Sequence, residues 1–127
     1  MNLKQALEPI APVVGFSSLI GAPGSVSEER IVGADLQNAI KKLAEIKDAQ
    51  KNCGSDYAYW GYEGQRAYWS AVVDILQAAE LVGNDNLPDV PPPDTEGKVV
   101  MDACWYIQKY GRDILEKAEE MRATTPK

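Results

Sequence analysis

The hydrophobic positions of this chain repeat with the period of an amphipathic helix in three long stretches. In the first, apolar side chains recur at alternating spacings of four and three residues: Val32, Leu36, Ala39, Leu43 and Ile46, with Ile40 widening the stripe. This spacing places them on one face of a helix. A capping box, Ser25 to Glu28, precedes the stripe and Gly54 follows it, so we expect a helix over residues 26–52.

The second stretch combines a ring-rich beginning with the most continuous apolar pattern of the chain. On a helical wheel one broad face collects Tyr62, Trp69, Val72, Val73, Leu76 and Ala79, extended by Tyr68 and Ile75. Ser55 or Asp56 can cap the start, and Gly83 ends the pattern. We expect a helix over residues 56–82, weakened at Gly61 in its first turns and more deeply buried than the other helices.

The third stretch repeats over three heptads and predicts a helix over residues 95–122. Its stripe consists of Val100, Cys104, Ile107, Gly111, Ile114, Ala118 and Met121. The small residues in this stripe should let a neighbouring helix approach closely. Residues 83–94 contain four prolines and form the connector between the second and third helices. Because such a connector can wrap the end of a bundle or cross it, the direction of the third helix stays open.

Residues 1–24 are expected to form a packing segment that lies across the open side of the bundle. The segment starts with Leu3, Ala6 and Leu7 at helical spacing, and Pro12 could open a second short helix through Val13, Phe16 and Ile20. The predicted fold class is therefore all-α. Residues 1–127 form a single domain with three long helices plus a short N-terminal helical segment.

The net charge of −6 is concentrated in one part of the sequence. Between Ala67 and Gly97 there are no basic residues, and the acidic residues are Asp74, Glu80, Asp85, Asp89, Asp94 and Glu96. Direct nucleic-acid binding would require the opposite sign, so we do not expect it. These acids either serve solubility or form a patch that meets a basic surface of another protein.

Several classes of chemistry are disfavoured by the residues present. The chain has no histidine, which removes the usual catalytic triads and His-ligated zinc. Cys53 and Cys104 are too far apart in sequence for a metal-binding pair, and their bonding state stays open. We therefore expect no cofactor, no metal ion and no catalytic residues.

One enzymatic alternative is a metal-dependent, nucleotide-hydrolysing all-α protein, because two pairs of acids occur at helical i, i+3 spacing. These pairs are Glu45 with Asp48 and Asp113 with Glu116. Each pair points away from the apolar stripe of its own helix, so the four carboxylates should not converge.

The N-terminal sequence does not read as a signal peptide, since Glu8, Pro9 and Pro12 interrupt its apolar part. The uncharged stretch over residues 9–27 contains too many prolines, glycines and serines for a spanning helix. We expect a cytoplasmic protein without membrane contact.

The leading functional hypothesis is that this small acidic protein binds another protein without catalysis, as an inhibitor, immunity-type or accessory protein of a bacterium or virus. The predicted partner-binding residues are Tyr57, Tyr59, Trp60, Tyr62, Arg66 and Trp105. Aromatic and arginine side chains of this kind carry much of the energy of protein interfaces. Two alternatives stay open: a small-ligand pocket lined by Tyr59, Tyr62, Arg66 and Trp69, and a homo-oligomer formed through helix faces.

Overall fold

The computed structural model describes residues 1–10, 36–94 and 99–124, which form four α-helices and no strand. The helices are α1 (Leu3–Leu7), α4 (Leu36–Lys51), α5 (Asp56–Val82) and α6 (Val100–Thr124). The predicted all-α fold, with three long helices and a short N-terminal one, is confirmed. The expected capping box at Ser25 and the expected helix after Pro12 lie outside the described residues. None of the helices in these ranges is both long and apolar enough to cross a lipid bilayer.

α5 is the central helix, because it packs against α1, α4 and α6. It is helical from Asp56 onward and continues through Gly61, the position expected to weaken its first turns. The Ser55 side chain caps this end by accepting a hydrogen bond from the Ala58 backbone N–H at 3.1 Å. At the other end Gly83 adopts φ 95°, a left-handed conformation that favours glycine, and its N–H donates to the Ala79 carbonyl.

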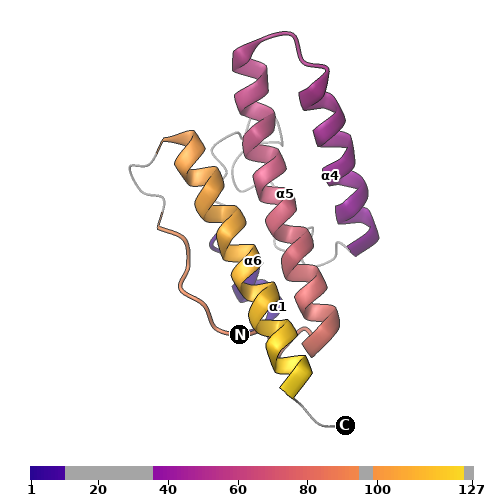
Figure 1. Cartoon of the computed structure of the whole chain (residues 1–127), viewed down its shortest axis with the longest axis vertical. Helices are drawn as coiled ribbons and strands as arrows, with labels where there is room; N and C mark the ends of the chain where they lie inside the picture. Colours follow the sequence, from indigo (N-terminus) through magenta and orange to yellow (C-terminus); the bar gives the residue numbers. More distant parts are fainter. Residues whose placement is uncertain (11–35, 95–98, 125–127) are drawn as a thin grey trace.

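α4 runs antiparallel to α5, whereas α6 runs parallel to it (Figure 1). Three contacts between α5 and α6 show the parallel direction, since residue numbers rise together along both helices. They are Arg66 with Gln108, Ala71 with Gly111, and Leu81 with Arg122. The connector 83–94 leads from the end of α5 back to the start of α6 along the outside of the bundle (Figure 1). The direction that the sequence left open is therefore decided.

The α5–α6 contact depends on small side chains. A Cβ added to Gly111 would lie only 2.8 Å from the Cα of Ala71, so no larger residue fits there without movement. Cys104 and Ala118, one heptad on either side of Gly111, are also buried. The small residues of the predicted stripe thus bring the two helices close together along their length.

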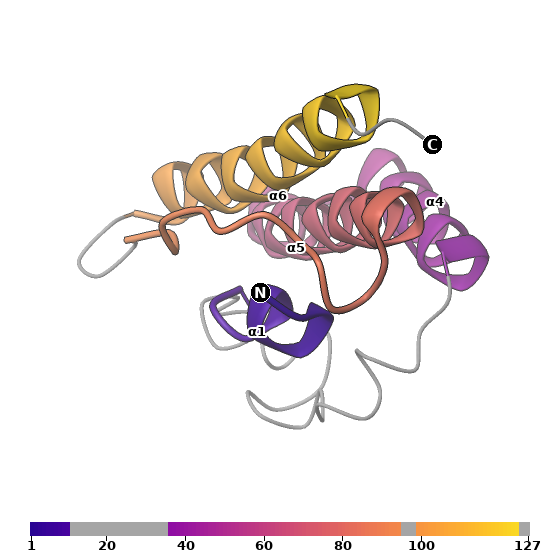
Figure 2. The ribbon, with the colours of Figure 1, turned by 90° about the horizontal axis from the view of Figure 1, so that it is seen from below.

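α1 and residues 8–10 lie on one side of the layer formed by α4, α5 and α6 (Figure 2). Leu3, Ala6, Leu7 and Ile10 are buried in the common core. The Tyr110 hydroxyl of α6 donates to the Ala6 carbonyl at 3.0 Å. Burial raises the pKa of Tyr110 to about 12. This short helix therefore completes the core rather than standing apart from it.

The start of α6 and the burial of two stripe residues differ from what the sequence pattern predicted. Val99 is not helical and α6 begins at Val100, five residues after the predicted start. Ile40, expected to widen the α4 stripe, is 39% exposed because the core-facing stripe of α4 is narrower. Met121, at the end of the α6 stripe, is 38% exposed. It lies in the last turns of α6, close to the end of the helix.

Candidate protein-interaction surface

Most of the exposed large hydrophobic side chains gather at one end of the bundle, where α5 and α6 both begin. In the described residues, eight large hydrophobic side chains are exposed, and only Ile40 and Met121 lie elsewhere. We call the other six the aromatic end: Tyr57, Tyr59, Trp60, Val99, Met101 and Trp105. An exposed apolar group of this size is typical of an interaction site.

The parallel arrangement of α5 and α6 explains why these residues come together. Arg66 contacts Gln108 across the helix pair. Trp60 precedes Arg66 by six residues and Trp105 precedes Gln108 by three, and each residue advances about 1.5 Å along a helix. Together with the contact of Ala71 with Gly111, this register separates the two tryptophans by about 5–8 Å along the bundle axis. An antiparallel α6 would have placed Trp105 at the opposite end.

Edge-to-face contacts hold three rings of this surface, those of Tyr59, Trp60 and Trp105. Tyr59 and Trp60 have centroids 5.3 Å apart with planes at 89°, and Trp105 and Tyr106 have centroids 4.9 Å apart at 78°. Trp60 is 39% exposed and Trp105 is 58% exposed, so each indole still offers a large part of its area to solvent. Rings that are already held in place lose less conformational entropy when a partner covers them.

A polar network behind the aromatic end ties α4, α5 and α6 together. Glu63 accepts hydrogen bonds from Nε and Nη2 of Arg66 at 2.7 and 2.6 Å, and from the Gln50 side chain at 2.9 Å. The Arg66 Nη1 donates to Gln108 at 3.4 Å. The Arg66 side chain is therefore already engaged by Glu63 within α5 and by Gln108 of α6.

Electrostatics within this network stabilise the charged forms of the pair. The hydrogen bond from Arg66 is the largest cause that lowers the pKa of Glu63, and it outweighs the opposing effect of burial. In the same way the hydrogen bond to Glu63 raises the pKa of Arg66. Burial raises the pKa of the neighbouring Cys104 to about 11, which keeps that thiol protonated and a poor nucleophile.

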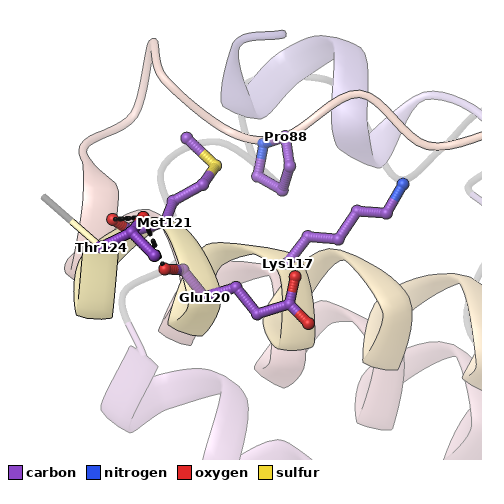
Figure 3. Close-up of a pocket in the computed structure, with 5 residues that line it drawn as sticks. All are labelled: Pro88, Lys117, Glu120, Met121 and Thr124. Atoms are coloured by element: carbon purple, nitrogen blue, oxygen red, sulfur yellow. Dashed lines mark hydrogen bonds between the residues drawn. The ribbon is translucent and has the colours of Figure 1, made fainter.

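Two pockets flank the aromatic end, and a third lies far from it. One pocket, of about 400 Å³, lies at the α4–α5 turn and includes Lys51, Asp56 and Tyr59. Another, of about 320 Å³, lies beside Trp105 on α6. The third, of about 370 Å³, lies between the connector and the last turns of α6, where Lys117 and Met121 extend on either side of Pro88 (Figure 3).

The remaining predicted site residues are distributed differently. Tyr62 is half-buried on α5. Of the acidic residues, Asp74 is half-buried, Asp89 pairs with the Met1 amine at 3.1 Å, and Glu96 lies outside the described residues. Glu80, Asp85 and Asp94 are exposed along the end of α5 and the connector. The described acids therefore extend along the molecule instead of forming one compact patch.

The paired acids of the enzymatic alternative also lie on separate surfaces. Glu45 and Asp48 are exposed on α4, while Asp113 on α6 pairs with Lys109 at 2.9 Å. Across the described ranges, no three carboxylate or thiol side chains come close enough together to hold a metal ion.

Sequence reasoning missed part of this arrangement. Val99 and Met101 join the aromatic end only because α6 begins beside α5. The Gln50–Glu63–Arg66–Gln108 network was also not anticipated, although the i, i+3 spacing of Glu63 and Arg66 was a signal for its central pair. Comparison with protein-family models finds no match, and neither curated proteins nor solved structures show significant similarity to this chain.

Proposed function

We propose that this protein acts by binding another protein, without catalysis, and that the aromatic end is the surface that the partner covers. The observation that supports this proposal is that six of the eight exposed large hydrophobic side chains in the described residues gather there. Scattered exposed apolar residues are normal on a protein surface, but a gathered group that includes two tyrosines and two tryptophans is not.

The energetics of association favour this use. Tyrosine and tryptophan bring large contact area at a low cost in side-chain entropy, and both are enriched among residues that dominate binding energy. The Gln50–Glu63–Arg66–Gln108 network joins α4 to α5 and α5 to α6, and α5 and α6 carry the rings. The surface is therefore organised before the partner arrives, which lowers the cost of binding.

The proposal includes the class and the setting of the protein. We propose a cytoplasmic inhibitor or accessory protein whose aromatic end provides the binding energy. The exposed acids of α5 and the connector would then steer a partner with a basic surface, since charges spread over a surface act mainly on the rate of encounter.

A capture experiment tests the proposal. We expect the double variant Trp60→Ala and Trp105→Ala to lose a specific partner at least tenfold in quantitative pull-downs, because interface tryptophans each contribute about 2 kcal/mol or more. The measurement is the amount of each captured protein, determined by mass spectrometry, relative to the wild-type chain.

The control is the double variant Ile40→Ala and Met121→Ala, which removes two exposed apolar side chains, 39% and 38% exposed, from other parts of the surface. It should capture the partner as the wild-type chain does. The proposal fails if both double variants, shown to be folded by circular dichroism, retain every partner at wild-type levels.

A further inference from the structure

The pocket beside Trp105 contains a positive charge that is in no ion pair within the described residues. It is lined by Trp105, Gln108, Lys109, Arg112 and Asp113, all from α6. Lys109 donates to Asp113 at 2.9 Å, so these two charges compensate each other. Within the described residues, Arg112 takes part in no hydrogen bond and no ion pair. Its guanidinium is therefore the unpaired charge of the pocket.

Arg112 interacts electrostatically with Asp74 on α5, but the two side chains are not in direct contact. Burial raises the pKa of Asp74, and the Arg112 charge only partly offsets this effect. The two groups form no ion pair within 4 Å. Arg112, which is exposed, consequently keeps its five N–H donors for another acceptor.

Trp105 is the apolar member of the pocket lining, and its ring has a neighbour that holds it in position. The indole of Trp105 is 58% exposed and makes an edge contact with Tyr106. The side chain of Gln108 donates to the Cys104 carbonyl at 3.3 Å and accepts from Arg66 at 3.4 Å. Gln108 therefore belongs both to the polar network behind the aromatic end and to the lining of this pocket, and these hydrogen bonds orient its amide.

We infer that the partner places an acidic side chain with an apolar neighbour in this pocket, the carboxylate on Arg112 and the apolar group on Trp105. This inference rests on the proposed function, because it names the chemistry that the partner presents to the aromatic end. A guanidinium matches a carboxylate through two parallel hydrogen bonds, and tryptophan with arginine is the pairing that interface energies favour.

The charge of the whole chain makes this recognition selective. A chain of net charge −6 repels acidic segments over most of its surface. An acidic residue is therefore attracted where Arg112 lies and disfavoured elsewhere, which sets the register of the partner as well as its affinity.

A titration with a defined probe tests the inference. The probe is the peptide N-acetyl-Leu-Glu-Leu-amide, and the readout is the indole N–H signals of the three tryptophans in a ¹⁵N-labelled chain, assigned with Trp→Phe variants. We expect the Trp105 signal to shift saturably while that of half-buried Trp69 stays in place. In Arg112→Gln the affinity should fall by at least about tenfold, because the charge-assisted hydrogen bonds of the guanidinium are lost.

Two controls make the result decisive. The peptide N-acetyl-Leu-Gln-Leu-amide should bind about tenfold more weakly, since it lacks the carboxylate. Arg122→Gln changes another exposed arginine of α6 and should bind the probe as the wild-type chain does. The inference is overturned if the probe does not shift Trp105, if the glutamine peptide binds equally well, or if Arg112→Gln binds unchanged. A partner whose capture needs Trp60 but is indifferent to Arg112→Gln would overturn this inference alone and leave the proposed function intact.

Discussion

At the scale of single residues, Arg66 has the sequence context of a ligand-binding residue, but in the structure its guanidinium is hydrogen-bonded to Glu63. The sequence places an arginine among aromatic rings, where it could hold a carboxylate from outside. The structure supplies that carboxylate from Glu63, one turn earlier, and leaves side-chain exposures of only 24% for Arg66 and 18% for Glu63. Replacing either partner would leave the other half-buried and poorly satisfied.

The pH dependence of stability tests this pair. Because the folded protein lowers the pKa of Glu63 below its ordinary value of 4.5, the pair stabilises the fold above that value and this stabilisation is lost as the pH falls further. We expect Glu63→Gln to cost roughly 1–2 kcal/mol of unfolding free energy at neutral pH, with a smaller difference from wild type at acidic pH. Urea titrations over a pH series measure this.

Glu116→Gln, which removes an exposed carboxylate from α6, controls for the loss of charge. A difference between wild type and Glu63→Gln that does not diminish toward acidic pH would show that the pair does not stabilise the fold in its charged form.

At the scale of helices, small residues allow the close contact of α6 with α5, and the pairing of residues across the two helices shows that they are parallel. The close contact between Gly111 and Ala71 lets α6 lie directly on α5. The proline-containing connector is long enough to bring the start of α6 to the end of the bundle where α5 starts. The periodic pattern of α6 does not indicate its direction, since an apolar stripe can face α5 whether the two helices are parallel or antiparallel. Only the pairing of particular residues across the two helices distinguishes the directions.

Gly111→Ala tests the α5–α6 contact. The added Cβ would meet the Ala71 backbone at 2.8 Å, so the helices must separate, and we expect a loss of about 1–3 kcal/mol in unfolding free energy. Chemical denaturation measures the change.

Gly54→Ala is the matched control, because no atom lies within 4 Å of the Cβ it would add. It should change stability by less than about 1 kcal/mol. Equal stability of the two variants would mean that the helices do not pack this closely in solution.

At the scale of the whole molecule, the accessibility of Cys53 and Cys104 indicates how tightly the core is packed. Cys104 is 3% exposed between α5 and α6, whereas Cys53 is half-buried at the α4–α5 turn and donates to the Gln50 carbonyl at 3.0 Å. Neither forms a disulfide in the structure. The environments of Cys53 and Cys104 therefore differ, although no sequence motif near either cysteine predicted this difference.

Thiol labelling at neutral pH checks this difference. We expect Cys53 to react quickly, and Cys104 to react only as fast as the protein unfolds, because burial raises its pKa to about 11 and blocks access. Ellman's reagent follows both rates, and Cys53→Ser should remove the fast phase alone. Fast reaction of both thiols in the native protein would argue against a single tightly packed core.

The sequence by itself determined the helices and their buried sides. Helical periodicity is a local property, because side chains three and four residues apart share a face whatever packs against them. Ser55 as a cap, Gly83 as a stop and the four-three spacing of α6 were therefore readable. Tyr110 was not, since its burial follows from the packing of the N-terminal residues, more than a hundred positions earlier, against α6.

Only the tertiary structure decided how the candidate surface is assembled. The aromatic end exists because α5 and α6 begin side by side, and Arg66 is occupied while Arg112 is free because of neighbours from other turns and other helices. These relations depend on contacts between residues distant in sequence, and no periodic pattern records which distant residues meet. The pattern of apolar positions determines which segments form helices with a face to bury. Gly111 allows α6 to lie close to α5, and the length of the connector allows the two helices to be parallel.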